Sequence, residues 1–291
     1  MFSVKNKLSV FSLVLFSTAI LFGCQTSGTL ENSPIAAENK TTVNPTFLEK
    51  AKSFAQEKTA KAIPNASAER DNIFMLLAYS VVYKDWQNAN MKNNRGYNIG
   101  SILVNEKEEV IYWARNSVNV TNNKTQHGEV RLINCYLANN ERNDMEEQTI
   151  YTTLEPCAMC SGMMFLTSLP RTVYGQKDPS FGDAIERLNL NSNDSPSGYP
   201  PYPRQVISDA SKLSQRYLLD FFYASYIKEH KDPSITDFLT TPEAEFVYRS
   251  AFDELKNFQV KYSENHSIKE QALEFYNSKV ADKYTKLCPD Q

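Results

Sequence analysis

The chain has 291 residues, 41% of them hydrophobic and 12% aromatic, enough to bury one sizeable core and to add an extension. Its 31 basic and 34 acidic residues leave a formal net charge of −3. This balance argues against a nucleic-acid-binding protein, which normally presents a basic face. The sequence also contains no glycine-rich phosphate-binding loop and no internal repeat.

The first 23 residues have the pattern of a signal peptide. Lys5 and Lys7 precede an apolar run from Leu8 to Phe22, which is short for a transmembrane helix. The run ends in the sequence LFGC, which resembles the processing site of bacterial lipoproteins. We expect cleavage before Cys24 and lipidation of Cys24 as the membrane anchor. By this resemblance, Gln25 favours the outer membrane, facing the periplasm; a plain signal peptide or an uncleaved anchor is the alternative.

Residues 24–45 are rich in Ser, Thr, Asn and Gly, which predicts a flexible tether without a core of its own. Without the signal segment, the chain has 29 basic and 34 acidic residues, a formal charge of −5. Helices are then expected over 47–63 and 69–91; in the second, Ile73, Leu77, Val81 and Val82 mark the buried face. Two strands, 98–104 and 109–115, follow with a polar turn between them.

The next segment carries the most informative residues of the chain. Val130, Ile133 and Leu137 recur at helical spacing, which places His127 and Glu129 on the first turn of a helix. Residues 148–153 indicate a short buried strand. Pro156 then favours a second helix start, with Cys157 and Cys160 on its opening turns, where the helix dipole and free N–H groups favour thiolates.

One histidine and two cysteines are the ligand set of a catalytic zinc ion. Three protein ligands leave the fourth position open for water, and the metal lowers the pKa of that water from ~16 to about 7. Glu129 lies two residues from His127 and is the predicted proton carrier. The order His-x-Glu followed by Pro-Cys-x-x-Cys is a known signature of zinc nucleobase deaminases. We therefore predict one Zn²⁺ per chain, bound by His127, Cys157 and Cys160.

The segments TLEPCAMCSGM (153–163) and RTVYG (171–175), with Asp178, resemble the cytidine and deoxycytidylate deaminase superfamily, nearest its tRNA adenosine and guanine deaminases. This resemblance covers roughly residues 71–190. It implies an α/β fold of three layers, a mixed sheet flanked by helices, and a substrate contact by Asn116; an asparagine that shapes a turn is the alternative role. Glu155 is not a zinc ligand in the family pattern and is expected to hold its loop by hydrogen bonds. The chain departs from the pattern at Gly128, where alanine is commoner.

The remaining chain is expected to add a proline-rich linker or loop, 191–204, and a helical extension, 205–291. Helices are predicted over 208–230, 242–262 and 268–287, the second with Thr241 as its N-cap. The extension is interpreted as extra helices packed on the deaminase domain, 46–190; a lid or a docking surface is the alternative. Cys135 is expected to be a core residue, and its pairing with Cys288 is left open.

The sequence thus predicts a zinc-dependent hydrolytic deaminase that replaces an exocyclic amine with oxygen and releases ammonia. The substrate inferred from the family and the predicted location is a small nucleobase or nucleoside. Two other classes remain: a deaminase-type toxin or effector acting on a macromolecule, and a zinc-stabilised binding module without catalysis. A thiol redox pair at Cys157 and Cys160 is a weaker alternative. Relatives often form dimers, and the oligomeric state, including a homodimer, is left open.

Overall fold

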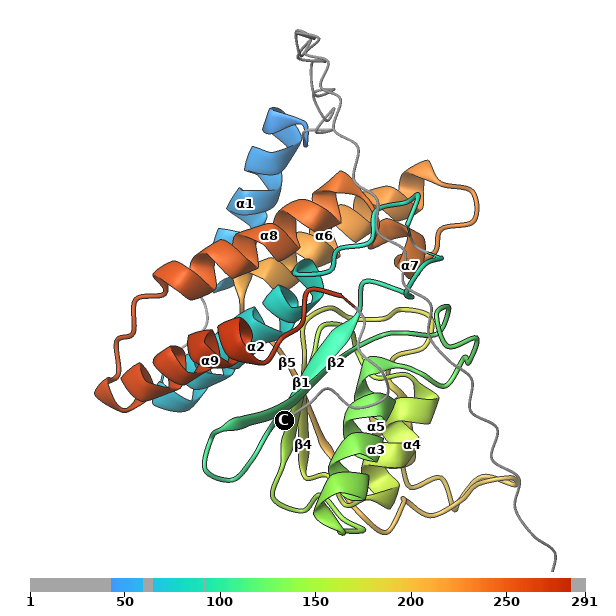
Figure 1. Ribbon diagram of the computed structural model, residues 1–291. Coiled ribbons are helices and arrows are strands. Elements are labelled where there is room, and N and C mark those ends of the chain that lie inside the picture. Colours follow the sequence, from blue (N-terminus) through green and yellow to red (C-terminus); the bar gives the residue numbers. More distant parts are fainter. Residues whose placement is uncertain (1–42, 60–64, 92, 284–291) are drawn as a thin grey trace, which may run out of the picture. The chain divides into compact units, whose positions relative to one another are not determined.

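The computed structural model of the chain describes residues 43–59, 65–91 and 93–283, which belong to one compact unit (Figure 1). The predicted signal peptide, Cys24, most of the predicted tether and Cys288 lie outside the described residues. Among the residues that are described, no helix has both the length and the apolar character needed to cross a membrane.

Helices and strands alternate through the first two thirds of the chain, and helices dominate the last third. The strands are β1 (Gly100–Val104), β2 (Val110–Arg115), β3 (Thr149–Thr152), β4 (Arg171–Tyr174) and β5 (Ile207–Ala210). The helices are α1 (Pro45–Thr59), α2 (Ala66–Tyr83), α3 (Gly128–Asn140), α4 (Ala158–Leu166), α5 (Ala184–Leu188), α6 (Ser214–Glu229), α7 (Ile235–Phe238), α8 (Pro242–Asn257) and α9 (His266–Ser278), with the 3-10 turn η1 (Ser263–Asn265).

The five strands form one mixed sheet in the order β2-β1-β3-β4-β5. β1 is antiparallel to both β2 and β3, whereas β3, β4 and β5 run parallel. In register, Thr152 at the end of β3 lies beside Tyr174 at the end of β4. The pairing continues past the strands, where the Glu155 amide donates to the Gln176 carbonyl at 2.8 Å. The segments that follow β3 and β4 therefore meet at one edge of the sheet.

Alternating strand residues divide the core into two layers, one on each face of the sheet. On one face, Ile102 and Tyr151 pack into a cluster with the side chains of α2, α6, α8 and α9. On the other, Leu103 and Ile150 pack against α3, α4 and α5. This alternation follows from the two-residue period of a strand. The predicted α/β fold, a mixed sheet flanked by helices, is confirmed.

Helix α2 is buried on all sides, not on the single face expected from its spacing. Every residue from Ile73 to Val82 is buried, because the sheet covers one side and α8 and α9 contact the helix from outside. A helix that is apolar all round belongs in an interior. Within this layer Tyr248 of α8 stacks edge-on against Tyr79 of α2, with ring centroids 5.0 Å apart. The C-terminal helices thus complete the core, as the favoured interpretation predicted.

Other expected element boundaries need correction. Residues 207–210 form strand β5, where the prediction placed the start of a helix; they pair with β4 through the backbone, which side-chain spacing does not reveal. The helices predicted to end at 91, 262 and 287 end at Tyr83, Asn257 and Ser278. Beyond α2 the chain is held by side chains: Asn98 accepts from the Gln87 amide at 3.0 Å and donates to the Gln87 carbonyl at 2.7 Å.

The segment after α9 is fastened to the edge of the sheet. The Trp113 indole donates to the Lys279 carbonyl at 2.9 Å, and Arg115 donates to the Ala281 carbonyl at 2.9 Å. Both donors lie on β2. The described residues just after α9 therefore pack against the same sheet that carries the predicted site.

Candidate active site

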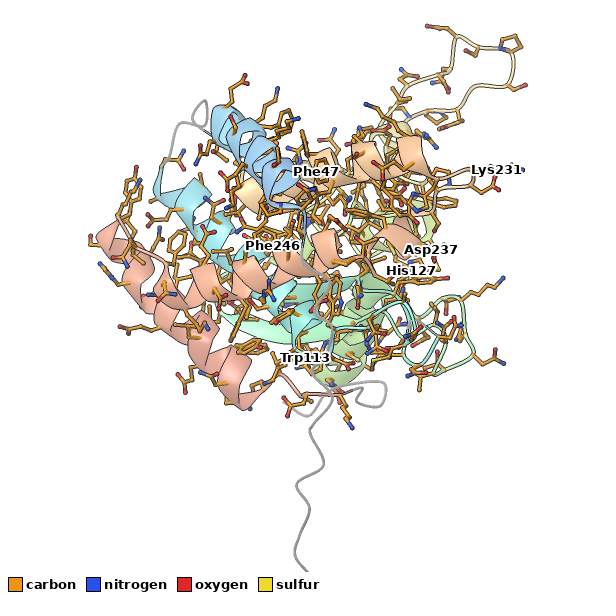
Figure 2. The ribbon with its side chains drawn as sticks, turned by 90° about the horizontal axis from the view of Figure 1, so that it is seen from above. Phe47, Trp113, His127, Lys231, Asp237 and Phe246 are labelled. Atoms are coloured by element: carbon orange, nitrogen blue, oxygen red, sulfur yellow. The ribbon has the colours of Figure 1, made fainter. Side chains whose placement is uncertain are left out.

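His127 lies at the start of α3, as its N-cap residue (Figure 2). The following residue, Gly128, begins the helix against the sheet: a Cβ there would lie 3.1 Å from Ser101 Oγ and 3.3 Å from the Ala114 carbonyl oxygen. Such distances are tighter than ordinary van der Waals contact. Glycine in place of the commoner alanine therefore lets α3 start close to β1 and β2, with His127 at the sheet edge.

Cys157 and Cys160 lie on the first turn of α4, Cys157 as the N-cap. The two Sγ atoms are 3.7 Å apart, and His127 Nδ1 is 3.7 Å from Cys157 Sγ and 3.6 Å from Cys160 Sγ. A tetrahedral zinc ion places two sulfurs about 3.8 Å apart and a sulfur and a nitrogen about 3.6 Å apart, given its usual bond lengths. The three donors therefore fit zinc in chemistry and in spacing.

The protonation of the two thiols also suits metal binding. Hydrogen bonding with Cys160, opposed by burial and helped by His127, lowers the pKa of Cys157 to about 4. Hydrogen bonding with Cys157 together with burial raises the pKa of Cys160. One of the two sulfurs is therefore already a thiolate at neutral pH, the form that binds metals.

Glu129 is 3% exposed, and burial raises the pKa of its carboxyl group. Its Oε1 accepts a hydrogen bond from Thr152 Oγ1 at 3.1 Å. Thr152 Oγ1 in turn accepts from Ser101 Oγ at 3.0 Å. Among the described residues, Oε2 has no hydrogen-bond partner. One carboxylate oxygen is thus held in place by Thr152, and the other is buried without such a bond.

Thr152 and Ser101 were not identified from the sequence. Ser101 on β1 lies opposite Thr152 on β3, and the two are 51 residues apart in the chain. The hint in the sequence was the pair Thr152-Thr153, two hydroxyl residues at the end of a buried strand. A buried hydroxyl requires a partner, but only strand pairing reveals which one.

Asn116 follows β2 and is fully buried. Its Oδ1 accepts from the Tyr97 amide at 3.1 Å and from the Val118 amide at 3.3 Å. Its Nδ2 has no partner among the described residues, which leaves a buried donor, normally satisfied by protein, water or ligand. A Cβ at Gly96 would lie 2.4 Å from Asn116 Oδ1, so this position requires glycine. The oxygen shapes the turn, and the nitrogen is a buried donor that no described residue pairs.

A buried ion pair supports the segment that carries Asn116. Arg95 Nε lies 2.8 Å from Asp85 Oδ2, and Arg95 also donates to the Asn116 carbonyl at 2.5 Å. Burial lowers the pKa of Arg95 to about 10, despite the opposing effect of Asp85, so the guanidinium is charged at neutral pH. The sequence analysis did not identify this pair.

Glu155 acts as its sequence position suggested, by fixing a loop. Its two carboxylate oxygens accept from the backbone amides of Asp178 at 2.9 Å and Asp183 at 3.1 Å. A Cβ at Gly182 would lie 2.2 Å from Glu155 Oε2, so the glycine permits this contact. The loop after β4 is thereby tied to the segment that leads into Cys157.

The remaining cysteine of the described residues lies on α3, the helix that also carries Glu129. Cys135 is 1% exposed and belongs to the core layer between the sheet and α3. Its burial agrees with the predicted core position, but its sulfur is disulfide-bonded and is not a free thiol.

The three-layer α/β fold brings one histidine, two cysteines and a buried carboxylate together at a sheet edge, and the histidine and the cysteines could hold a metal ion. Residues 69–176 match the family model described as the cytidine and deoxycytidylate deaminase zinc-binding region. The chain is also 36% identical over 114 residues to a probable cytosine deaminase of Schizosaccharomyces pombe, covering 37% of this chain and 68% of the relative. This chain belongs to the cytidine and deoxycytidylate deaminase family.

Relatives with other substrates are equally similar. The tRNA-specific adenosine deaminase 2 of Xenopus laevis is 34% identical over 110 residues, 36% of this chain; the match spans only 62% of that relative's length. A solved structure from a study of A-to-I editing by tRNA:A34 deaminases shares 27% identity and covers 47% of this chain and 91% of its own, with a TM-score of 0.37. The family assignment rests on the sequence matches.

Proposed function

We propose that this chain is a zinc-dependent hydrolytic deaminase whose substrate is a free nucleobase or nucleoside. The observation that carries the proposal is the position of Glu129 Oε2, a buried carboxylate oxygen without a partner among the described residues, two residues from His127. A zinc site that only stabilises a fold has no use for such a group. When bound, zinc supplies Lewis acidity that makes water a nucleophile at neutral pH.

The residues of the chain move the protons. Glu129 accepts a proton from the attacking water at Oε2 while Thr152 holds Oε1 at 3.1 Å. The carboxyl group passes that proton to the ring nitrogen, and a second transfer lets the exocyclic amine leave as ammonia. One water is consumed: its oxygen becomes the ring carbonyl, and the C–N bond breaks. Asn116 Nδ2 would donate to an acceptor atom of the base or sugar and orient it.

The preference for a small substrate is supported by charge. Net charge is −3 for the whole chain, and a polynucleotide substrate is normally attracted by a basic surface. Lipid anchoring through Cys24 at the outer membrane, facing the periplasm, is part of the same proposal. In that compartment free bases and nucleosides are the substrates to expect.

The test is a screen for ammonia release by the zinc-loaded chain against guanine, adenine, cytosine and their nucleosides. We expect release with at least one of them. The Glu129→Ala variant should retain one zinc per chain, measured by mass spectrometry of the metal, and lose activity by ~10²–10⁴-fold, the usual contribution of general acid–base catalysis. Transfer RNA is tested in parallel, with inosine formation as the readout. Inosine formation there, without ammonia release from the small compounds, would reassign the substrate to a macromolecule. If the zinc-loaded chain released no ammonia and formed no inosine with any of these substrates, the catalytic proposal would be contradicted.

A further inference from the structure

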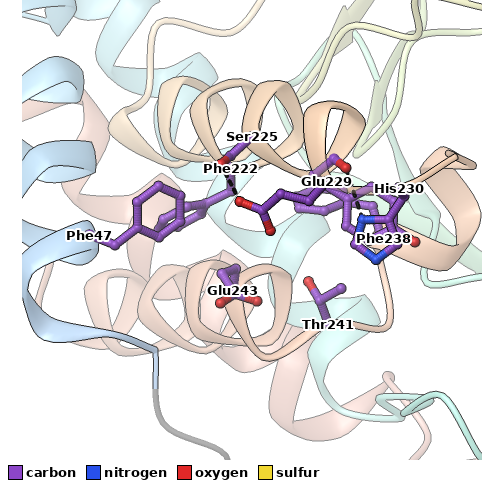
Figure 3. Close-up of a pocket in the computed structure, with 9 residues that line it drawn as sticks. Phe47, Phe222, Ser225, Glu229, His230, Phe238, Thr241 and Glu243 are labelled. Atoms are coloured by element: carbon purple, nitrogen blue, oxygen red, sulfur yellow. Dashed lines mark hydrogen bonds between the residues drawn. The ribbon is translucent and has the colours of Figure 1, made fainter.

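A cavity lies among helices that carry none of the residues assigned to the zinc site. Its volume is about 160 Å³, and it is lined by residues of α1, α6, α7 and the start of α8 (Figure 3). We refer to it as the helix cavity. For comparison, a cavity of ~150 Å³ lined by apolar side chains accommodates benzene. The helix cavity is therefore large enough for a ligand of a few non-hydrogen atoms.

Aromatic rings line the helix cavity at both ends. At one end Phe47 of α1 and Phe222 of α6 have ring centroids 5.3 Å apart. At the other, Tyr226 packs against Phe238 at 5.6 Å and stacks on His230 at 3.8 Å. His230 lies at the end of α6, with Nδ1 2.9 Å from the Tyr226 carbonyl oxygen. The faces of such rings carry partial negative charge and attract cations.

The charged side chains of the lining are carboxylates. Glu229 and Glu243 line the helix cavity, and none of its described lining residues is lysine or arginine. Figure 3 shows the Glu229 carboxylate directed into the space between Phe47 and Glu243. Ser225 Oγ donates to Glu229 Oε1 at 3.2 Å, which helps to hold that carboxylate. The lining thus combines aromatic rings with two carboxylates, of which Glu229 is exposed and Glu243 is half-buried.

The partial charges at the nearby helix ends do not cancel the charge of these carboxylates. α6 ends at Glu229, and its unpaired carbonyl groups add partial negative charge; α8 begins at Pro242, and its free N–H groups add partial positive charge. These two contributions oppose each other. The carboxylates of Glu229 and Glu243 are therefore the acidic groups that a ligand in the helix cavity would meet.

We propose that the helix cavity binds a small organic cation, an alkylammonium compound whose apolar groups contact the aromatic rings. Its charged nitrogen lies between Glu229 and Glu243. A metal ion is a poorer match because four aromatic side chains offer it no ligand atoms, whereas they suit methyl and methylene groups. The site is independent of the deaminase reaction, so its test needs no substrate.

The probes are choline and its uncharged isostere 3,3-dimethyl-1-butanol, titrated by calorimetry into the zinc-loaded chain. We expect choline to bind at least tenfold more tightly than the isostere. The double variant Glu229→Gln/Glu243→Gln should weaken choline binding by at least tenfold. Glu245→Gln is the matched control, since Glu245 shares the first turn of α8 with Glu243 but does not line the helix cavity; it should leave binding unchanged.

Several results would overturn the proposal. Absence of choline binding would do so, as would equal binding of choline and the isostere. Binding that survives the double carboxylate variant would place the cation elsewhere. Binding lost in Glu129→Gln but retained in the double variant would place it at the zinc site. Circular dichroism of each variant verifies that the fold is intact.

Discussion

The two faces of the sheet are built on different principles. On the face of α3 and α4, residues close in the sequence lie close in space: His127 and Glu129 share one helix start, and Cys157 and Cys160 share another. On the face of α2, the contacts join segments far apart, such as Lys84 with Val280, 196 residues along the chain. The first face carries chemistry, and the second encloses a buried helix. Substitutions should separate these two roles.

The largest effect is expected at the zinc ligands. Cys157→Ser removes one of three donors, so zinc content should fall from one per chain to near zero and activity to below detection, because the metal supplies the Lewis acidity. Metal content and ammonia release are the measurements. Ser168→Ala, outside the site, is the control and should keep both. If the Cys157→Ser chain retained stoichiometric zinc, the ligand assignment would be wrong.

A large-to-small substitution on the other face should affect stability without affecting chemistry. Leu255 on α8 is fully buried, and Leu255→Ala should lower the free energy of unfolding by ~2–5 kcal/mol. Urea denaturation of the zinc-loaded chain measures it. The folded variant should keep its zinc and its turnover number. Unchanged stability would mean that α8 is not part of the common core.

Thr152→Val tests the hydrogen bond that positions Glu129. The valine keeps the volume but removes the hydroxyl, and loss of a hydrogen bond to a charged group costs roughly 1.5–3 kcal/mol. We expect kcat to fall by ~10–100-fold, with KM and zinc content nearly unchanged. Thr152→Ser should restore most of the rate because it restores the donor. Equal losses in both variants would indicate packing, not positioning, as the role of Thr152.

The smallest effect concerns pH and the contact between α2 and the loop before α9. Burial opposes ionisation of Glu69, but hydrogen bonds from Asn265 and from the Lys261 and Tyr262 amides outweigh it and lower the pKa of Glu69. A lowered folded-state pKa stabilises the fold above the unfolded value of about 4.3, and this stability is lost as the pH falls.

Glu69→Gln should remove part of that dependence. The free energy of unfolding of the natural chain should fall more steeply below pH about 4.3 than that of the variant. Urea denaturation between pH 3 and 7 gives both curves, with Glu270→Gln, on the exposed side of α9, as the control. Parallel curves for all three chains would exclude a contribution from Glu69.

The sequence by itself pointed to His127, Cys157 and Cys160 as candidate zinc ligands, because helix starts and short spacings are local properties. It also indicated Glu129, Asn116 and the N-cap Thr241, whose side chain accepts from the Ala244 amide at 3.3 Å. Motif spacing, helix periodicity and N-cap preference are local and are sufficient to predict Glu129 and Thr241. Asn116 was predicted from the family resemblance, and its oxygen accepts from Tyr97, 19 residues away.

Only the tertiary structure decided which distant groups meet. It brought the two motifs within 3.7 Å of each other, placed Thr152 against Glu129, and paired Arg95 with Asp85. It also made residues 207–210 a strand and buried α2 on all sides, because strand pairing and helix packing depend on segments that periodicity does not relate. The helix cavity has the same origin, since α1, α6, α7 and α8 meet there only after the core has formed.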